Sequence, residues 1–115
     1  MKKLFLSTGF IWLAVTCFAH PGIGIVKDSE GNIYYTDLKQ VWKIGRDGNQ
    51  TVVVPKVHTH ELYVDANDNL YGEHLWYNGE KLNTWGSYAW CLHRNGKLDT
   101  VVAPHEGFLE EYSFC

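Results

Sequence analysis

The residues with the most chemical potential lie near the middle of the chain, where histidines and a glutamate are closely spaced. His58 and His60 are two residues apart, Glu61 follows directly, and His74 comes a short distance later. Alternate side chains of a strand point to one side, about 6–7 Å apart at the backbone, so one ion could contact both histidines. The pattern predicts a metal site of His60, Glu61 and His74, in which zinc or a similar divalent ion activates water. The alternative is a set of exposed or hydrogen-bonded loop histidines that hold no ion.

A second group of side chains is suited to binding a ligand rather than to catalysis. Its aromatic rings provide flat apolar faces, and its acidic and imidazole groups provide hydrogen bonds. The predicted ligand-binding residues are His58, Glu73, Trp76, Tyr77, Trp85, Tyr88, His105 and Glu106. Such a set suits a small molecule, a carbohydrate or a protein partner. The sequence leaves the cofactor open, and a divalent metal ion is the one candidate.

The overall composition argues against several classes of protein. Lysine and arginine total 10 against 13 aspartates and glutamates, which gives a net charge of −3. A basic surface for nucleic acid is therefore not expected. The chain also lacks phosphate-binding glycine loops and a GxSxG motif, so the sequence predicts neither nucleotide binding nor serine hydrolysis. Hydrophobic residues at 45% and aromatic residues at 15% favour a folded domain rich in strands.

The N-terminal segment 1–19 has the three parts of a secretory signal peptide. Lys2 and Lys3 precede an apolar run, and small residues, Cys17 and Ala19, precede a predicted cleavage site before His20. The apolar run is shorter than the roughly 20 residues that span a bilayer. We expect a secreted or periplasmic protein without stable membrane insertion after cleavage. The alternatives are a retained anchor, a buried core helix and lipidation of Cys17.

The remaining chain contains an internal repeat, which is the strongest signal for its fold. The matching segments are Asp28–Tyr34 with Asp65–Tyr71, Val41–Gly48 with Ala89–Gly96, and Thr51–Val53 with Thr100–Val102. The order of the matches and their turn residues are the same in both copies. The chain therefore carries two copies of one unit and the start of a third.

Each copy is predicted to form four short antiparallel strands and no helix. The predicted strands are 23–27, 33–37, 41–44 and 51–54 in the first copy, and 61–65, 70–74, 88–92 and 98–102 in the second. The turns between them are rich in aspartate, asparagine and glycine, which accept the backbone angles of tight turns. We therefore expect the turn acids to be structural. Trp42 and Trp90 match in the repeat, so both are predicted to lie in the core, and Cys91 is predicted to be a buried small hydrophobe.

A four-stranded antiparallel unit that repeats is typical of a β-propeller blade. The segments Pro21–Asp28 and Gly31–Asp37 resemble the blade signature of NHL-repeat propellers, within a wider group of six-bladed propellers that includes the senescence-marker and gluconolactonase-like proteins. The second copy departs from that signature, because His58–Glu61 replaces the Pro-Gly entry and His74 stands in place of Asp37. The resemblance implies an all-β fold more strongly than it implies an activity.

The resemblance also implies a domain organisation. Blade one is predicted to span 20–57, blade two 58–104, and the start of blade three 105–115. Propellers have four to eight blades, so we expect an N-terminal portion of a six-bladed propeller. The alternative is a small protein that closes its ring by forming oligomers.

In a propeller, the loops between the second and third strands open on the same face as the entries to the blades. In the second copy this connection is much longer, running from His74 to Ala89 instead of from Asp37 to Val41. We therefore expect all the predicted site residues to gather on this loop face. The predicted function is an exported scaffold that binds a small ligand or a protein partner there. The alternative is a metal-dependent hydrolase or lactonase-like enzyme.

Overall fold

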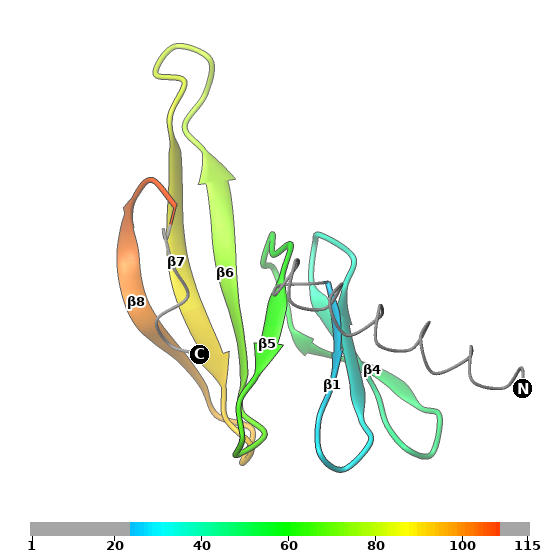
Figure 1. Ribbon diagram of the computed structural model, residues 1–115. Coiled ribbons are helices and arrows are strands. Elements are labelled where there is room, and N and C mark those ends of the chain that lie inside the picture. The colour runs from blue at the N-terminus through cyan, green and yellow to red at the C-terminus, as the bar shows by residue number, and fades with distance from the viewer. Residues whose placement is uncertain (1–23, 109–115) are drawn as a thin grey trace, which may run out of the picture.

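The computed structural model describes residues 24–108, which form eight β-strands and, within this range, no helix (Figure 1). The strands are β1 (Ile25–Lys27), β2 (Ile33–Thr36), β3 (Val41–Ile44), β4 (Gln50–Val54), β5 (Leu62–Val64), β6 (Leu70–Tyr77), β7 (Trp85–Leu92) and β8 (Leu98–Glu106). The all-β class is confirmed. The predicted signal peptide 1–19, its cleavage site and the residues 109–115 assigned to blade three lie outside the described residues.

The strands form two separate four-stranded sheets, each built from one copy of the repeat. Sheet one has the order β1-β2-β3-β4 and sheet two the order β5-β6-β7-β8, with every pair of neighbours antiparallel. Each sheet is an up-and-down meander, as expected of a propeller blade. Two such units are compatible with blades, and a closed ring is not part of the described structure.

The turn between β1 and β2 shows why the repeated aspartate and asparagine are needed. Asp28 accepts the backbone N–H groups of Glu30 and Asn32 at 2.9 Å, and its second oxygen accepts the Asn32 amide at 2.9 Å and the Tyr34 hydroxyl at 3.2 Å. Burial acts to raise the pKa of Asp28, but these hydrogen bonds outweigh it and the pKa lies below its ordinary value. The carboxylate is thus kept charged as the centre of the turn.

The turn between β5 and β6 repeats this arrangement in the second copy. Asp65 accepts the N–H groups of Asn67 and Asn69 at 2.9 Å, the Asn69 amide at 3.1 Å and the Tyr71 hydroxyl at 3.0 Å. Burial and the hydrogen bond to Asp65 raise the pKa of Tyr71 above its ordinary value. The prediction that the turn acids are structural is confirmed for Asp28 and Asp65.

The pairing of the last two strands corrects one detail of the predicted repeat. Trp42 pairs with Val52 in sheet one, and Trp90 pairs with Thr100 in sheet two. Val52 is therefore equivalent to Thr100, so the match of Thr51–Val53 to Thr100–Val102 was wrong by one residue. The two hairpin turns have the same length, and each sheet has a bulge beside its tryptophan, which fixes this register.

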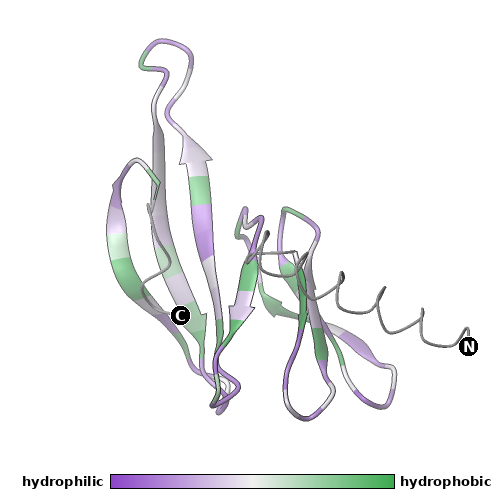
Figure 2. Ribbon diagram, viewed as in Figure 1, coloured by the Kyte–Doolittle hydropathy of each residue, from purple (hydrophilic) through white to green (hydrophobic). Residues whose placement is uncertain are grey.

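The hydrophobic core lies between the two sheets, where apolar segments face one another (Figure 2). β5 lies against β1 and β2, and brings the start of sheet two onto sheet one. The most deeply buried members are Val41, Val54, Val57, Leu62, Leu70 and Trp90. Each sheet thus buries one face against the other, as packed blades do.

The two equivalent tryptophans differ in burial, which corrects one sequence prediction. Trp90 is 1% exposed and belongs to the core as predicted. Trp42 is half-buried on the outer face of sheet one, where its ring stacks on Tyr35 and its Nε1–H donates to Asp37 at 3.0 Å. The prediction of a core Trp42 was wrong because the same face of the unit is covered in sheet two and uncovered in sheet one.

Half of the long connection in the second copy is strand, not loop. β6 and β7 continue pairing as far as Tyr77 and Trp85, and only residues 78–84 remain as the connection. The end of β6, residues 78–84 and the start of β7 project beyond sheet one as a hairpin (Figure 1). We call this hairpin, residues 75–88, the arm. The predicted loop was wrong here, and its side chains alternate between two faces of a sheet.

The C-terminal edge of sheet two also extends further than expected. β8 runs to Glu106, which pairs with Gly86, and the Gly107 N–H donates to the Trp85 carbonyl at 2.8 Å. His105 and Glu106, assigned from the sequence to the start of blade three, therefore belong to sheet two. Among residues 24–108 no helix is long and apolar enough to cross a membrane.

Candidate functional site

Three of the predicted histidines form a connected chain beside the β2–β3 turn, at the end of sheet one that lies away from the Asp28 turn. The Nε2 atoms of His58 and His60 are 2.9 Å apart, and the backbone N–H of His58 donates to Nδ1 of His74 at 2.8 Å. The rings of His58 and His60 meet edge to face, with centroids 4.6 Å apart. The prediction that these residues gather is confirmed for the three histidines.

The hydrogen bonds fix which nitrogen of each ring carries the proton. The Leu38 carbonyl can only accept, so the His58 Nδ1 atom that lies 2.8 Å from it must donate. In neutral His58 the other nitrogen is then an acceptor, and His60 Nε2–H donates to it. His74 accepts through Nδ1, which leaves its Nε2–H as the donor of that ring.

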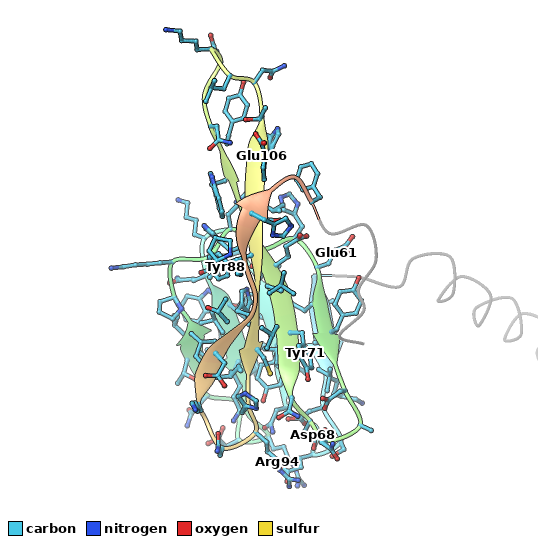
Figure 3. All side chains as sticks on the ribbon, turned by 90° about the vertical axis from the view of Figure 1, so that its left-hand side faces the viewer. Glu61, Asp68, Tyr71, Tyr88, Arg94 and Glu106 are labelled. Carbon is cyan, nitrogen blue, oxygen red and sulfur yellow. The ribbon has the colours of Figure 1, made fainter. Side chains whose placement is uncertain are left out.

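Aromatic rings flank the histidines on one face of the arm. The His74 ring lies 6.0 Å from Trp76 and 5.1 Å from Tyr88, and Trp76 and Tyr88 are 6.5 Å apart, all measured between ring centroids. Trp76 pairs with Gly86, whose missing side chain leaves room for the indole. We call His58, His60, His74, Trp76 and Tyr88 the histidine–aromatic cluster. Figure 3 shows Tyr88 near the middle of sheet two, between Glu106 on the side of the arm and Asp68 and Arg94 at the turn end.

A buried threonine holds the histidine segment in place. Thr59 is fully buried, its hydroxyl accepts the Trp90 Nε1–H at 3.1 Å, and its carbonyl accepts the Thr36 hydroxyl at 2.7 Å. The neighbouring His58 carbonyl accepts the Leu75 N–H at 3.0 Å. The segment is thus bonded to both sheets. Thr59 was not predicted as a site residue, although its place between two histidines was a usable signal.

The other predicted ligand-binding residues do not join this cluster. Tyr77 and Trp85 pair on the opposite face of the arm, with ring centroids 4.9 Å apart, and Trp85 also contacts Phe108. Glu73 is buried in β6, and its place in the strand puts it on the opposite face from His74. The prediction of a single loop face was therefore wrong for these residues, because strand alternation divides them.

The acidic residues and His105 lie at separate places along sheet two. Glu61 precedes β5 and accepts the Tyr63 hydroxyl at 3.1 Å. Glu106 is level with Gly86 and, by register, shares a face with Trp76. The positions of Glu61 and Glu106 are shown in Figure 3.

The predicted metal site requires three ligands placed around one point. Within residues 24–108, no group of three or more histidine, cysteine, aspartate or glutamate side chains is placed to hold a metal ion. His60 faces His58 rather than Glu61, and Nδ1 of His74 accepts a backbone N–H. The described residues thus do not fit a three-ligand site at His60, Glu61 and His74.

Ser87 and His105 form a pair that resembles a nucleophile and its base. The Ser87 hydroxyl oxygen lies 3.5 Å from Nε2 of His105, and His105 Nδ1 is 2.9 Å from the Ala103 carbonyl. The hydroxyl, however, donates to the Gly107 carbonyl at 2.6 Å and Ser87 is fully buried. The pair is structural, because its proton is committed to a carbonyl and no substrate can reach it.

A hollow of about 240 Å³ lies at the turn end of the molecule, between the two sheets. An ion pair and a turn contact join the sheets there: Arg94 bonds to Glu30 at 2.9 Å, and the Ser29 N–H donates to Asp68 at 2.9 Å. These groups bond to one another across the two sheets. We therefore assign the hollow to packing between the sheets rather than to a ligand.

The fold and the site define a two-sheet, blade-like all-β unit with a histidine–aromatic cluster at one end. No family model, no curated protein and no solved structure matches the chain.

The pH dependence of stability gives a first test of this geometry. Burial and the neighbouring His58 lower the pKa of His74 below its ordinary value of 6.5. The unfolded chain then binds more protons than the folded one, so the contribution of neutral His74 is present above about pH 6.5 and is lost as the pH falls through the folded pKa. We expect the urea midpoint to fall on acidification. His74→Asn, which keeps an acceptor near Nδ1 but does not titrate, should reduce this fall, and an equal fall in both proteins would contradict the role of His74.

Proposed function

We propose that this chain is an exported, NHL-like β-propeller module that binds a carbohydrate through the histidine–aromatic cluster. The observation that carries the proposal is the fixed arrangement of His74 against Trp76 and Tyr88, with His58 and His60 joined to it by hydrogen bonds. The leader-like segment 1–19 supports export, and the two repeated meanders support the propeller relationship.

A sugar ring suits both kinds of group in the cluster. Its C–H faces pack against aromatic rings such as Trp76, and its hydroxyls need donors and acceptors placed beside those rings. His74 Nε2–H is a donor of this kind, because Nδ1 of the same ring is already used. Trp76 and Tyr88 are half-buried, so part of each ring stays accessible.

A metal-dependent hydrolase, the alternative predicted from the sequence, is less well supported. Its required ion has no three-ligand group among the described residues. The Ser87–His105 pair offers no accessible nucleophile. A binding function needs neither.

The proposal predicts that Trp76→Ala weakens sugar binding by about tenfold or more, since a central aromatic contact is worth about 1.4 kcal/mol or more. His74→Ala should weaken it as well. The measurement is titration of the purified protein with a panel of soluble oligosaccharides, followed by calorimetry and tryptophan fluorescence.

The matched control is Trp85→Ala, on the opposite face of the same arm. This variant should bind like the wild type. Equal losses in the Trp76 and Trp85 variants would contradict the assignment of one face. Binding of short peptides but of no sugar would show that the site is assigned correctly and that its ligand is a peptide, not a carbohydrate.

A further inference from the structure

Each sheet has an inner face in the core and an outer face that no other described strand covers. On the outer face of sheet two, Glu73, Ala89 and Cys91 are nevertheless buried, at 8%, 0% and 1% exposed. The outer face of sheet one carries Ile25, Tyr35, Trp42 and Val52, which are level with one another in the pairing of its strands. Ile25 is 55% exposed and Val52 is 39% exposed. The stacked rings of Tyr35 and Trp42 lie between them.

This outer face is equivalent in the repeat to a face that is buried. Ile25 has the strand position of Leu62, and Trp42 has that of Trp90, each tryptophan following the same bulge. Leu62 is fully buried and Trp90 is 1% exposed, because both pack against sheet one. The outer face of sheet one is thus a second copy of the half of the core that sheet two supplies.

The outer face of sheet two is equivalent to the other half of the core. Ala89 and Val102 pair beside the bulge as Val41 and Val54 do in sheet one. Val41 and Val54 are both fully buried in the core.

The bulge residue itself shows the same relationship. Val53 is skipped by the pairing of β3 with β4 and packs against the core, and Val101 is skipped in the same way between β7 and β8. Val101 is 43% exposed. Val53 is therefore covered in sheet one, whereas its equivalent Val101 is partly exposed in sheet two.

We propose that the outer face of sheet one binds the outer face of sheet two from a second copy of this chain, reproducing the contact that joins the two sheets within one copy. The partner is a second copy because this chain carries both halves of the interface. The same contact already occurs within one copy, between the inner faces of sheet one and sheet two. Such a contact is head to tail, so it can be repeated until a ring closes.

The turn end supports the same alignment. Within one copy, Arg94 of sheet two bonds to Glu30 of sheet one. Arg46 has the repeat position of Arg94, and Asn67 has that of Glu30. Between copies, Arg46 would face Asn67, whose amide oxygen can accept from the guanidinium group.

The test uses two variants that each damage one outer face. Ile25→Lys puts a charge on the outer face of sheet one, and Val101→Lys puts one on that of sheet two. The wild-type chain should sediment as a closed oligomer, and each variant should sediment as a monomer. Mixing the two variants leaves one intact face on each, so it should give a one-to-one dimer that grows no further. Leu82→Lys, at the tip of the arm and 67% exposed, should keep the wild-type mass.

Several outcomes would overturn the proposal. A wild-type chain that is monomeric at every concentration would mean that something other than a second copy covers these faces. Oligomers that survive both lysine substitutions would place the contact elsewhere. Loss of assembly in Ile25→Lys alone, with Val101→Lys unaffected, would indicate a contact between two identical faces. Should a lysine variant lose its β-sheet circular dichroism, Ile25→Thr and Val101→Thr replace the pair in the same mixing experiment.

Discussion

Trp90→Ala is expected to destabilise the chain by about 3–5 kcal/mol, the cost of truncating a large buried aromatic side chain. Trp90 is 1% exposed in the core between the two sheets. Its removal leaves a cavity against sheet one and deprives the buried Thr59 hydroxyl of its donor. The measurement is the free energy of unfolding from urea melts followed by circular dichroism.

The matched control is the equivalent tryptophan of sheet one. Trp42→Ala removes a half-buried ring on an outer face and should cost about 1 kcal/mol. Both substitutions are best made in the Ile25→Lys background, because contacts between copies would otherwise add to the cost at Trp42. Equal losses at the two positions in that background would contradict the structural difference between the sheets.

The strands and turns were predictable because their signals are local. Asp28 and Asp65 each bond to residues two to six positions later, so the turn can be recognised within one short segment. Alternating apolar residues then mark the strands beside the turns. β3 was predicted at Val41–Ile44, the range that the structure has.

The arm and the burial of Trp42 could not be predicted in the same way, because both depend on contacts between distant parts. The pairing of Tyr77 with Trp85 decides whether the insertion is strand or loop, and its sequence also fits a loop rich in asparagine and glycine. Trp42 and Trp90 match in the repeat, and only the presence of a neighbouring sheet distinguishes them.

The candidate site shows the same division between local and distant information. The closeness of His58 and His60 follows from their spacing on one segment. Their link to His74 depends on how that segment lies along β6, where His58 also accepts the Leu75 N–H. Residue types thus predicted which groups could bind, whereas the division of the aromatic residues between two faces came from strand register.

Gly72→Ala is expected to destabilise the chain by about 3 kcal/mol, at the upper end of the range for overpacking a core. A Cβ atom at Gly72 would overlap the Trp90 ring, lying 2.7 Å from its Cε2 atom, and would be 2.9 Å from the Thr59 methyl group. Trp90 cannot move away, because its ring is buried and its Nε1–H is bonded to Thr59. The substitution therefore strains the contact between the sheets, and a urea melt should show a lower midpoint with an unchanged slope.

Gly86→Ala is the control, because it places a Cβ atom against a tryptophan ring that lies on the arm and not in the core. A Cβ atom there would overlap Trp76 as severely, lying 2.6 Å from its Nε1 atom. Trp76 is half-buried on the projecting arm, so its ring can turn outward, and the free energy of unfolding should change by less than about 1 kcal/mol. The displaced ring should instead weaken sugar binding. If Gly86→Ala destabilised the chain as much as Gly72→Ala, Trp76 would be as firmly packed as Trp90, and it could not serve as an accessible binding surface.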